Sequence, residues 1–317
     1  MQGRAFLGKF AEPPPPQVFG FRGRMDERSD LVRSATDGRY VYVRNYMPHV
    51  VYGRHLEYMF QTPTTRVWKK LFDEHKLNAV QEAFWKTKPP EELYDLTSDP
   101  DEVRNLAGSP EHQAVLAGLR RAQQDLARRV RDVGFLPEGE RFARAPGRSP
   151  YDLARDGAAY PFDRVFAAAE AASMSGPEAI PEMKALLADG DAAVRYWGAM
   201  GILMRGRPGV EAAGAGLRAA LADKSAYVRI AAAEALGRYG DEPDVKRVLA
   251  LLLELADAGR NDVFTAMAAL DVLDVLGDRA APAAGAIKAL SVKATLPDPR
   301  YAPYIPRLLG DLQERWK

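Results

Sequence analysis

An internal repeat in the second half of the sequence limits what this chain can fold into more than any other feature. The segment Asp189–Arg195 leads into an apolar run, and Asp223–Arg229 repeats this pattern 34 residues later. A weaker third copy starts near Asn261. Each copy predicts a pair of helices that cannot bury its apolar faces alone. We therefore expect successive pairs to stack into a helical solenoid.

The repeat also predicts roles for single residues. Val194 and Val228 hold the same position in their copies and are expected in the core, while Arg195 and Arg229 are expected to brace neighbouring turns. The first helices of the three pairs are predicted at residues 179–187, 212–221 and 245–256.

The first half follows a different pattern, with short runs of Tyr, Phe, Val and Arg between turn signals. Asp37-Gly38 is a strong hairpin signal because these residues tolerate a positive φ. A helix is predicted from Pro110 to Val133 with Ser109 as its N-cap. The predicted strands are Gln17–Arg24, Leu31–Ala35, Arg39–Tyr46 and Glu92–Leu96, and two short helices are expected at Thr65–His75 and Asn78–Trp85.

The third predicted strand has two different sides. Val41 and Val43 are expected to pack on the long helix, and Tyr40, Tyr42, Arg44 and Tyr46 to face the other way. That aromatic side is either an exposed interaction surface or is covered by the insertion Tyr52–Trp85. The predicted fold class is α+β: a small antiparallel four-stranded sheet with a packed helix, followed by an all-α HEAT-like solenoid.

The change in pattern predicts the domain boundaries. Prolines and glycines between Pro137 and Pro161 interrupt any regular element. The prediction is therefore a first domain at 1–140, a Pro/Gly-rich linker at 141–161 and helical repeats at 162–317.

Composition excludes several classes of function. The net charge of +1 gives no field that would attract a nucleic acid, and no apolar stretch is long enough to span a membrane. The absence of cysteine excludes disulfides and a thiol nucleophile. Met1–Phe10 lacks the apolar core of a signal peptide, so the chain as written would stay in the cytoplasm. We expect, however, that Met1 is not the natural start, in which case a signal peptide upstream would export the protein.

The repeat resembles the bacterial form of the HEAT family through its Asp-x-x-x-x-Val-Arg turn and its Ala-rich second helix. This resemblance covers about residues 162–317 and implies an α-solenoid used for protein contacts. A helical spacer that packs on the neighbouring domain remains the alternative.

The first half resembles the C-terminal region of bacterial sulfatases of the alkaline-phosphatase-like superfamily, and is similar to the C-terminal domain of N-sulfoglucosamine sulfohydrolases. The resemblance covers about residues 1–140. The residues that carry it are Glu92–Leu96, Asp99-Pro100, Glu102, Asn105–Ala107, Arg33-Ser34, Asp37–Tyr40 and Tyr42–Arg44.

The resemblance implies a formylglycine nucleophile, made from the first residue of a Cys/Ser-x-Pro-x-Arg motif, and a calcium ion held by Asp-Asp and Asp-Asn pairs. This chain departs from both. Its Ser98-Asp99-Pro100 pattern continues to Glu102 instead of Arg, and the calcium-binding pairs are missing. We therefore predict no catalytic residue and no metal ligand here, and expect calcium and formylglycine only in a full-length sulfatase.

The loop Met47–Tyr58 is the most site-like segment, because it concentrates ionisable side chains directly after a strand. In an intact sulfatase, such a loop is expected to contact the substrate. The alternatives are a solvated surface loop and a zinc site, although the histidine spacing matches no standard zinc pattern. The predicted substrate contacts are His49, Arg54, His55 and Glu57, with Arg22, Arg24 and Arg44 helping to bind an anion.

Three hypotheses follow. The first is a truncated or split sulfatase that is inert alone. The second is a stand-alone interaction protein, with a partner bound by the solenoid or by the Tyr40/Tyr42 face. The third is an active hydrolase that works through His49, His55 and Glu57.

Overall fold

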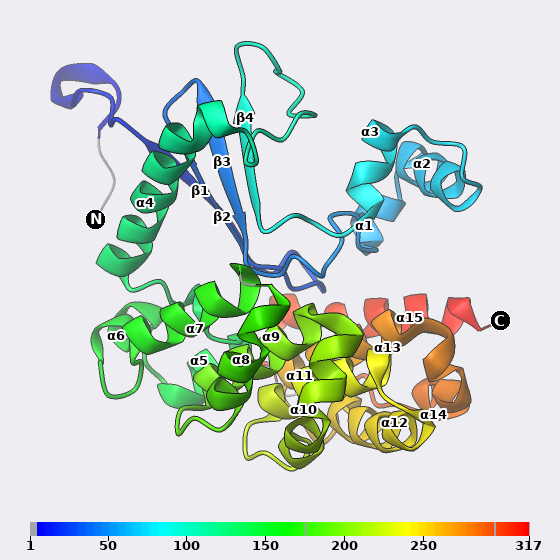
Figure 1. Cartoon of the computed structure of the whole chain (residues 1–317). Coiled ribbons are helices and arrows are strands. Elements are labelled where there is room, and N and C mark those ends of the chain that lie inside the picture. The colour runs from blue at the N-terminus through cyan, green and yellow to red at the C-terminus, as the bar shows by residue number, and fades with distance from the viewer. Residues whose placement is uncertain (1–4, 175, 295, 317) are drawn as a thin grey trace.

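The computed structural model describes residues 5–174, 176–294 and 296–316. Figure 1 shows a sheet with one long helix beside it, and below them an array of packed helices. This confirms the predicted α+β class, an antiparallel four-stranded sheet followed by a helical repeat region. The two parts are joined by packing, since Leu31 and Tyr46 at the end of the sheet belong to the same apolar core as the repeat helices.

The sheet is an antiparallel meander in the order β1-β2-β3-β4. The predicted turn joins the second and third strands, where Gly38 has a φ of 95° that glycine adopts at no steric cost. The Asp37 carboxylate accepts hydrogen bonds from the backbone N–H groups of Arg39 and Tyr40, which fixes the turn. The strands are β1 (Val18–Arg22), β2 (Val32–Thr36), β3 (Tyr40–Asn45) and β4 (Glu91–Asp95), close to the predicted runs.

Helix α4 (Gln113–Val130) covers the tyrosine side of β3. Tyr42 is fully buried there, in a cluster with Leu93 and Leu119. The prediction that the valine side of β3 faces this helix is therefore wrong. The predicted Tyr40/Tyr42 interaction face is wrong as well, because α4 already occupies it.

The strand register explains this reversal. Ala35 and Leu93 lie opposite Tyr42 on the neighbouring strands, so the three side chains form one apolar face. The Tyr42 hydroxyl donates to the Glu91 carboxylate at 2.6 Å. The ring can therefore be buried while the hydroxyl keeps a hydrogen-bond partner. The insertion after β3, which was the other expected cover, does not belong to this cluster.

The insertion forms a separate lobe beside the sheet (Figure 1). Its core is aromatic: Trp68 stacks on Phe84 at 4.7 Å between ring centroids, and Trp85 packs edge-on to Trp68 at 5.3 Å. Its elements are α1 (Glu57–Phe60), α2 (Pro63–Asp73), α3 (Ala79–Glu82) and the 3-10 turn η2 (Ala83–Trp85), so both predicted helices are present.

The segment predicted to lack regular structure contains two short helices, α5 (Glu138–Arg144) and α6 (Pro150–Arg155). The prediction is wrong at this point because Ser149 and Asp152 form a capping box and Pro150 suits the first turn of a helix. Leu153 and Tyr160 are buried in the core shared with the repeats, so the segment packs rather than spans a gap.

The repeat region forms the predicted helix pairs, and Val194 and Val228 are buried in its core as expected. Arg195 bonds Asp223 of the next turn at 2.7 Å and Arg229 reaches Glu254 at 3.3 Å, which confirms both predicted braces. The helices are α7 (Phe162–Met174), α8 (Ile180–Leu187), α9 (Ala192–Met204), α10 (Gly206–Ala220), α11 (Ala226–Tyr239), α12 (Glu242–Ala256), α13 (Val263–Leu276), α14 (Ala284–Lys288) and α15 (Tyr304–Arg315).

The two rows of the solenoid have different surroundings. Helices α9, α11 and α13 lie on the side of the sheet, and α8, α10 and α12 lie on the opposite side (Figure 1). Helix α15 packs against α13 and extends the inner row. The end of the sheet is therefore in position to contact the inner helices.

Candidate functional site

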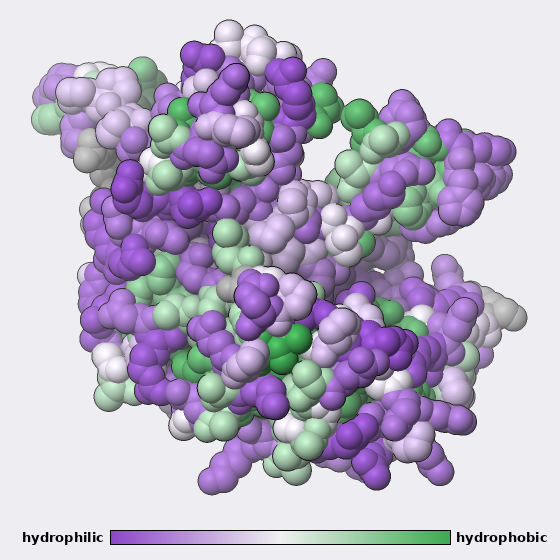
Figure 2. Space-filling view, viewed as in Figure 1, coloured by the Kyte–Doolittle hydropathy of each residue, from purple (hydrophilic) through white to green (hydrophobic). Residues whose placement is uncertain are grey.

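A cleft of about 1070 Å³ lies between the end of the sheet and the repeat helices. One wall consists of the loops that follow β1 and β3, and the other of α9, α11, α13 and α15. Residues from the segment 132–141 also line the cleft. In Figure 2 the surface is notched between the lobe of α1–α3 and the helices below it, and hydrophilic residues border the notch. The cleft is therefore built from both halves of the chain, and charged side chains line it together with many apolar ones.

Arg28, in the loop after β1, is the centre of the ionic contacts across this junction. Its side chain is 2% exposed, and its guanidinium lies 2.9 Å from both Asp271 and Asp274 and 2.7 Å from Asp311. Its Nε donates to the backbone oxygen of His55. Burial alone would lower the pKa of Arg28, but the three carboxylates outweigh burial and raise it.

Two of the predicted site residues join the same network. His55 Nδ1 lies 2.6 Å from Asp311 Oδ1, and an Arg54 nitrogen lies 3.3 Å from Asp271. Burial would raise the pKa of Asp311, but the hydrogen bond from His55 and the nearby arginine charges lower it overall. Both His55 and Arg54 line the cleft, but each is held by a carboxylate of the repeat helices.

His49 also lines the cleft, is less exposed than His55 and has fewer partners. Its Nε2 is 4.0 Å from Glu234 of α11, and its Nδ1 is buried without a hydrogen-bond partner among the described residues. Burial, and then the charges of Arg238, Lys88 and Arg54, lower the pKa of His49 to about 3. Burial raises the pKa of Glu234 in spite of the nearby Arg238. His49 is therefore a neutral ring at physiological pH.

Arg24 lines another part of the cleft, against α5. Its Nε donates to Glu138 at 2.6 Å, and its guanidinium lies over the rings of Tyr301 and Tyr304 at 5.0 and 5.1 Å. Arg141 of α5 lines the same cleft, and its Nε is buried without a hydrogen-bond partner in the described structure.

The other three predicted contacts do not line the cleft. Arg22 points its Nε toward Asp30 at 3.8 Å. Glu57 begins α1, where its backbone N–H donates to the Glu27 carboxylate. Arg44 is 1% exposed and bonds Ser173 and Glu170 of α7, so it connects the sheet to the repeats rather than facing a ligand.

Sequence reasoning missed the strongest contacts of this site. Arg28 stands in the charged run Asp26–Asp30, which is unusual for the tip of a small sheet, and Asp271 and Asp274 interrupt an otherwise apolar helix at a spacing of one turn. The charged loop and the two aspartates in an apolar helix could have been predicted to contact each other. Lys88 is also buried with Asp30 at 2.5 Å, but its neighbours Thr87 and Pro89 gave no such signal.

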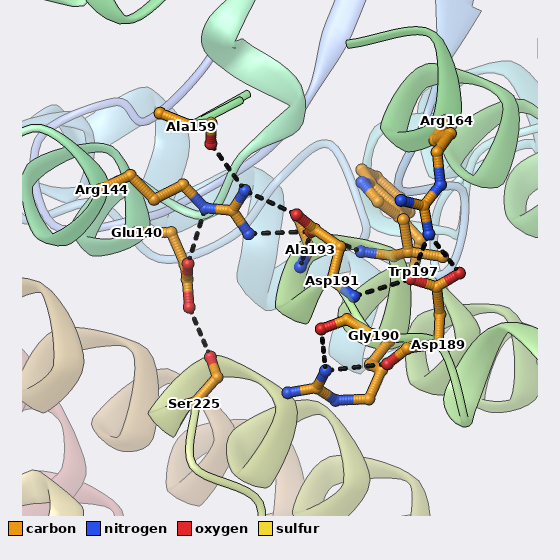
Figure 3. A network of polar contacts seen from close by, with 12 residues as sticks. Glu140, Arg144, Ala159, Arg164, Asp189, Gly190, Asp191, Ala193, Trp197 and Ser225 are labelled. Carbon is orange, nitrogen blue, oxygen red and sulfur yellow. Dashed lines mark hydrogen bonds and ion pairs between the residues drawn. The ribbon is translucent and has the colours of Figure 1, made fainter. Parts of the chain in front are cut away.

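Helix α5 fixes the segment between the sheet and the repeats (Figure 3). Arg144 bonds both carboxylate oxygens of Asp191, at 2.8 and 2.9 Å, and also Glu140 at 3.0 Å. Asp191 caps α9 through the backbone N–H groups of Ala193 and Val194. The contact therefore joins α5 to the start of a repeat helix and holds one wall of the cleft in place.

Residues 5–174, 176–294 and 296–316 contain no group of three or more His, Cys, Asp or Glu side chains arranged to hold a metal ion. Among the helices of those same ranges, none has the length and apolar character needed to cross a membrane.

Comparisons with known proteins identify two regions of likeness. A family model described as HEAT repeats matches residues 183–273, which correspond to α8 through most of α13. An ulvan-active sulfatase from Formosa agariphila is 37% identical over 96 residues, which are 30% of this chain and 16% of that protein. The chain thus spans only a small part of the curated relative. It combines a sulfatase-related region with HEAT-type helical repeats.

Proposed function

We propose that this chain is the C-terminal part of a sulfatase-family protein of bacterial type, in the alkaline-phosphatase-like superfamily, and that it is inert when alone. In this proposal the repeats hold the loop Met47–Tyr58 in a fixed position beside the substrate path of the complete enzyme. In the same proposal, the nucleophile and the calcium site belong to a part of the enzyme outside these 317 residues. The likeness to the ulvan-active sulfatase supports the lineage.

The observation that carries the proposed positioning of the loop is the Arg28 network. A buried arginine bonded to Asp271, Asp274 and Asp311 ties the sheet loops to two repeat helices at once. His55 and Arg54 are held by the same carboxylates. Such cross-linking preorganises a loop, which is what a substrate-positioning element needs.

The sequence supports the proposed absence of a nucleophile. There is no cysteine, and the nearest Ser-x-Pro pattern, at Ser98, lacks the arginine of the motif. Asp99 in that pattern accepts hydrogen bonds from the backbone N–H groups of Val103 and Arg104. Such contacts are typical of a residue that stabilises a turn.

Two measurements test the proposal. The coding DNA upstream of Met1 should continue as an open frame that encodes an Asp-Asp pair and a Cys-x-Pro-x-Arg motif. The purified chain, with calcium added, should hydrolyse an aryl sulfate no faster than buffer. Turnover that His55→Ala abolishes would contradict the proposal and favour a hydrolase built from His49, His55 and Glu57. For the complete enzyme we propose a sulfate ester as the substrate.

The second candidate function is a stand-alone interaction module, which the HEAT match favours because such repeats suggest protein contacts. Its binding surface is restricted by the structure. The inner row contacts the sheet loops through Glu234, Asp271 and Asp274, so a partner would have to use another face, such as α8, α10 and α12. A promoter and ribosome-binding site directly before Met1 would favour this candidate.

A further inference from the structure

Arg141 differs from the other charged residues of α5. Glu138 bonds Arg24 at 2.6 Å, Arg144 bonds Asp191 at 2.8 Å, and Glu140 accepts from Ser225 at 2.6 Å. Each of these contacts fixes α5 to another element. Arg141 makes no side-chain hydrogen bond or ion pair with any residue in the described part of the chain, and its Nε is buried.

The surroundings of Arg141 carry an excess of positive charge. Arg24 pairs with Glu138, and Arg33 pairs with Asp132 at 2.6 Å, so both nearby carboxylates are already bonded to other guanidinium groups. Burial lowers the pKa of Arg141, and Arg24 and Arg33 lower it further, while Glu138 and Asp132 partly compensate. A guanidinium has no accessible neutral form in water, so its charge must be balanced by solvent or by an anion.

Arg141 also faces open space. It lines the cleft of about 1070 Å³, as do Arg24 and Arg33. His49, whose buried Nδ1 has no partner among the described residues, lines the same cleft. Polar atoms left without partners in one cavity are uncommon in folded proteins and are normally matched by water or a ligand. The cavity is large enough for a small polar molecule.

We propose that Arg141 binds an oxyanion, a sulfate, phosphate or carboxylate group, in the cleft between the sheet and the repeats. The planar fork of the guanidinium matches two oxygens of such a group. Arg24 and Arg33 favour the anion through their charge while remaining bonded to their own carboxylates. The proposal does not depend on a substrate-binding role of the loop Met47–Tyr58 or on the proposed sulfatase lineage.

Calorimetric titration with inorganic sulfate at constant ionic strength tests the proposal. We expect saturable binding to the intact chain and a loss of affinity of about tenfold or more in Arg141→Met, because charge-assisted hydrogen bonds are among the stronger polar contacts. Arg141→Lys should keep part of the affinity, since it retains the charge but not the fork. Parallel titrations with phosphate and acetate identify the preferred oxyanion.

The matched control is Arg129→Met, which removes an exposed arginine at the end of α4 and should bind sulfate as the unmodified chain does. Thermal unfolding gives a second readout. Sulfate raises the stability of most proteins by exclusion from their surface, and that effect is common to all variants. Specific binding is therefore measured by the difference in sulfate-induced stabilisation between Arg129→Met and Arg141→Met. Equal sulfate responses in the two variants, or no saturable binding to the unmodified chain, would overturn the proposal. Should Arg141→Met not fold, equal sulfate affinity in Arg141→Lys and the unmodified chain would overturn it.

Discussion

Nη1 of Arg28 lies 2.9 Å from Oδ1 of Asp271, although 243 residues separate the two in the sequence. This contact joins the tip of a small sheet to the middle of an apolar repeat helix. Asp274 and Asp311 also bond Arg28, so one cation is shared by three carboxylates from two helices. The junction is therefore electrostatic at its centre.

Replacing Arg28 should weaken the fold strongly. Arg28→Met leaves Asp271, Asp274 and Asp311 without their shared counter-charge, and breaking a buried network in this way costs on the order of 3–5 kcal/mol of unfolding free energy. Urea denaturation followed by circular dichroism measures it, with Arg129→Met as the surface control. Adding Asp274→Asn to Arg28→Met should recover part of the loss. A cost below about 1 kcal/mol would mean that the network does not hold the two parts together.

Two arginines that reach the same repeat turn should differ in their contribution to stability (Figure 3). Arg144 is 13% exposed and bonds both oxygens of Asp191, whereas Arg164 is 58% exposed and bonds Asp189. We expect Arg144→Met to cost about 2 kcal/mol, because it removes a partly buried bidentate pair that also orients a helix cap. Arg164→Met should cost about 0–1 kcal/mol. Equal losses in thermal unfolding would contradict this difference.

His49 should make the fold sensitive to acid. Its pKa falls from 6.5 to about 3 in the folded chain, so between these values the unfolded chain binds a proton that the folded chain excludes. Stability therefore falls as the pH falls through this window, by at most about 1.4 kcal/mol per pH unit. Glu234 acts in the opposite direction. Its pKa is raised, so its contribution is present at low pH and is lost as the pH rises.

His49→Gln removes the titrating ring and should flatten the acid limb of a plot of unfolding free energy against pH. The control is His75→Asn, at an exposed position whose φ of 54° asparagine tolerates. An unchanged slope in His49→Gln would show that the ring is not kept neutral by burial.

The tyrosine side of the sheet should behave as core. Tyr42→Ala is expected to cost about 3–5 kcal/mol, because it opens a cavity between β3 and α4. Tyr42→Phe keeps the ring and loses only the hydrogen bond to Glu91, which Arg120 still holds at 2.6 Å, so a cost of about 1 kcal/mol is expected. Chemical unfolding of the two variants checks both values. If Tyr42→Ala lowered the free energy of unfolding only slightly, Tyr42 would lie on an exposed surface and not in the core.

The local patterns of the sequence were sufficient for most of the elements. Repeat spacing and the Asp37-Gly38 turn predicted the helix pairs and the hairpin, because each depends on residues close together in the chain. The predicted long helix is present as α4, but the predicted start is wrong in detail: a 3-10 turn occupies Pro110–His112, and Ser109 makes no capping hydrogen bond. Of the predicted site residues, His49, Arg54, His55 and Arg24 do line one cleft. Arg44 does not, because its partners Glu170 and Ser173 come from a helix more than a hundred residues away.

The sequence alone determined the two kinds of architecture, since periodicity and turn chemistry are local properties that survive in any context. Only the tertiary structure decided which side of β3 is buried, that residues 141–161 pack into the core, and which charges meet at the cleft. Those outcomes depend on distant partners such as Leu119 for Tyr42 and Asp271 for Arg28. A charge or a ring in one segment carries no information about which distant segment will supply its counterpart.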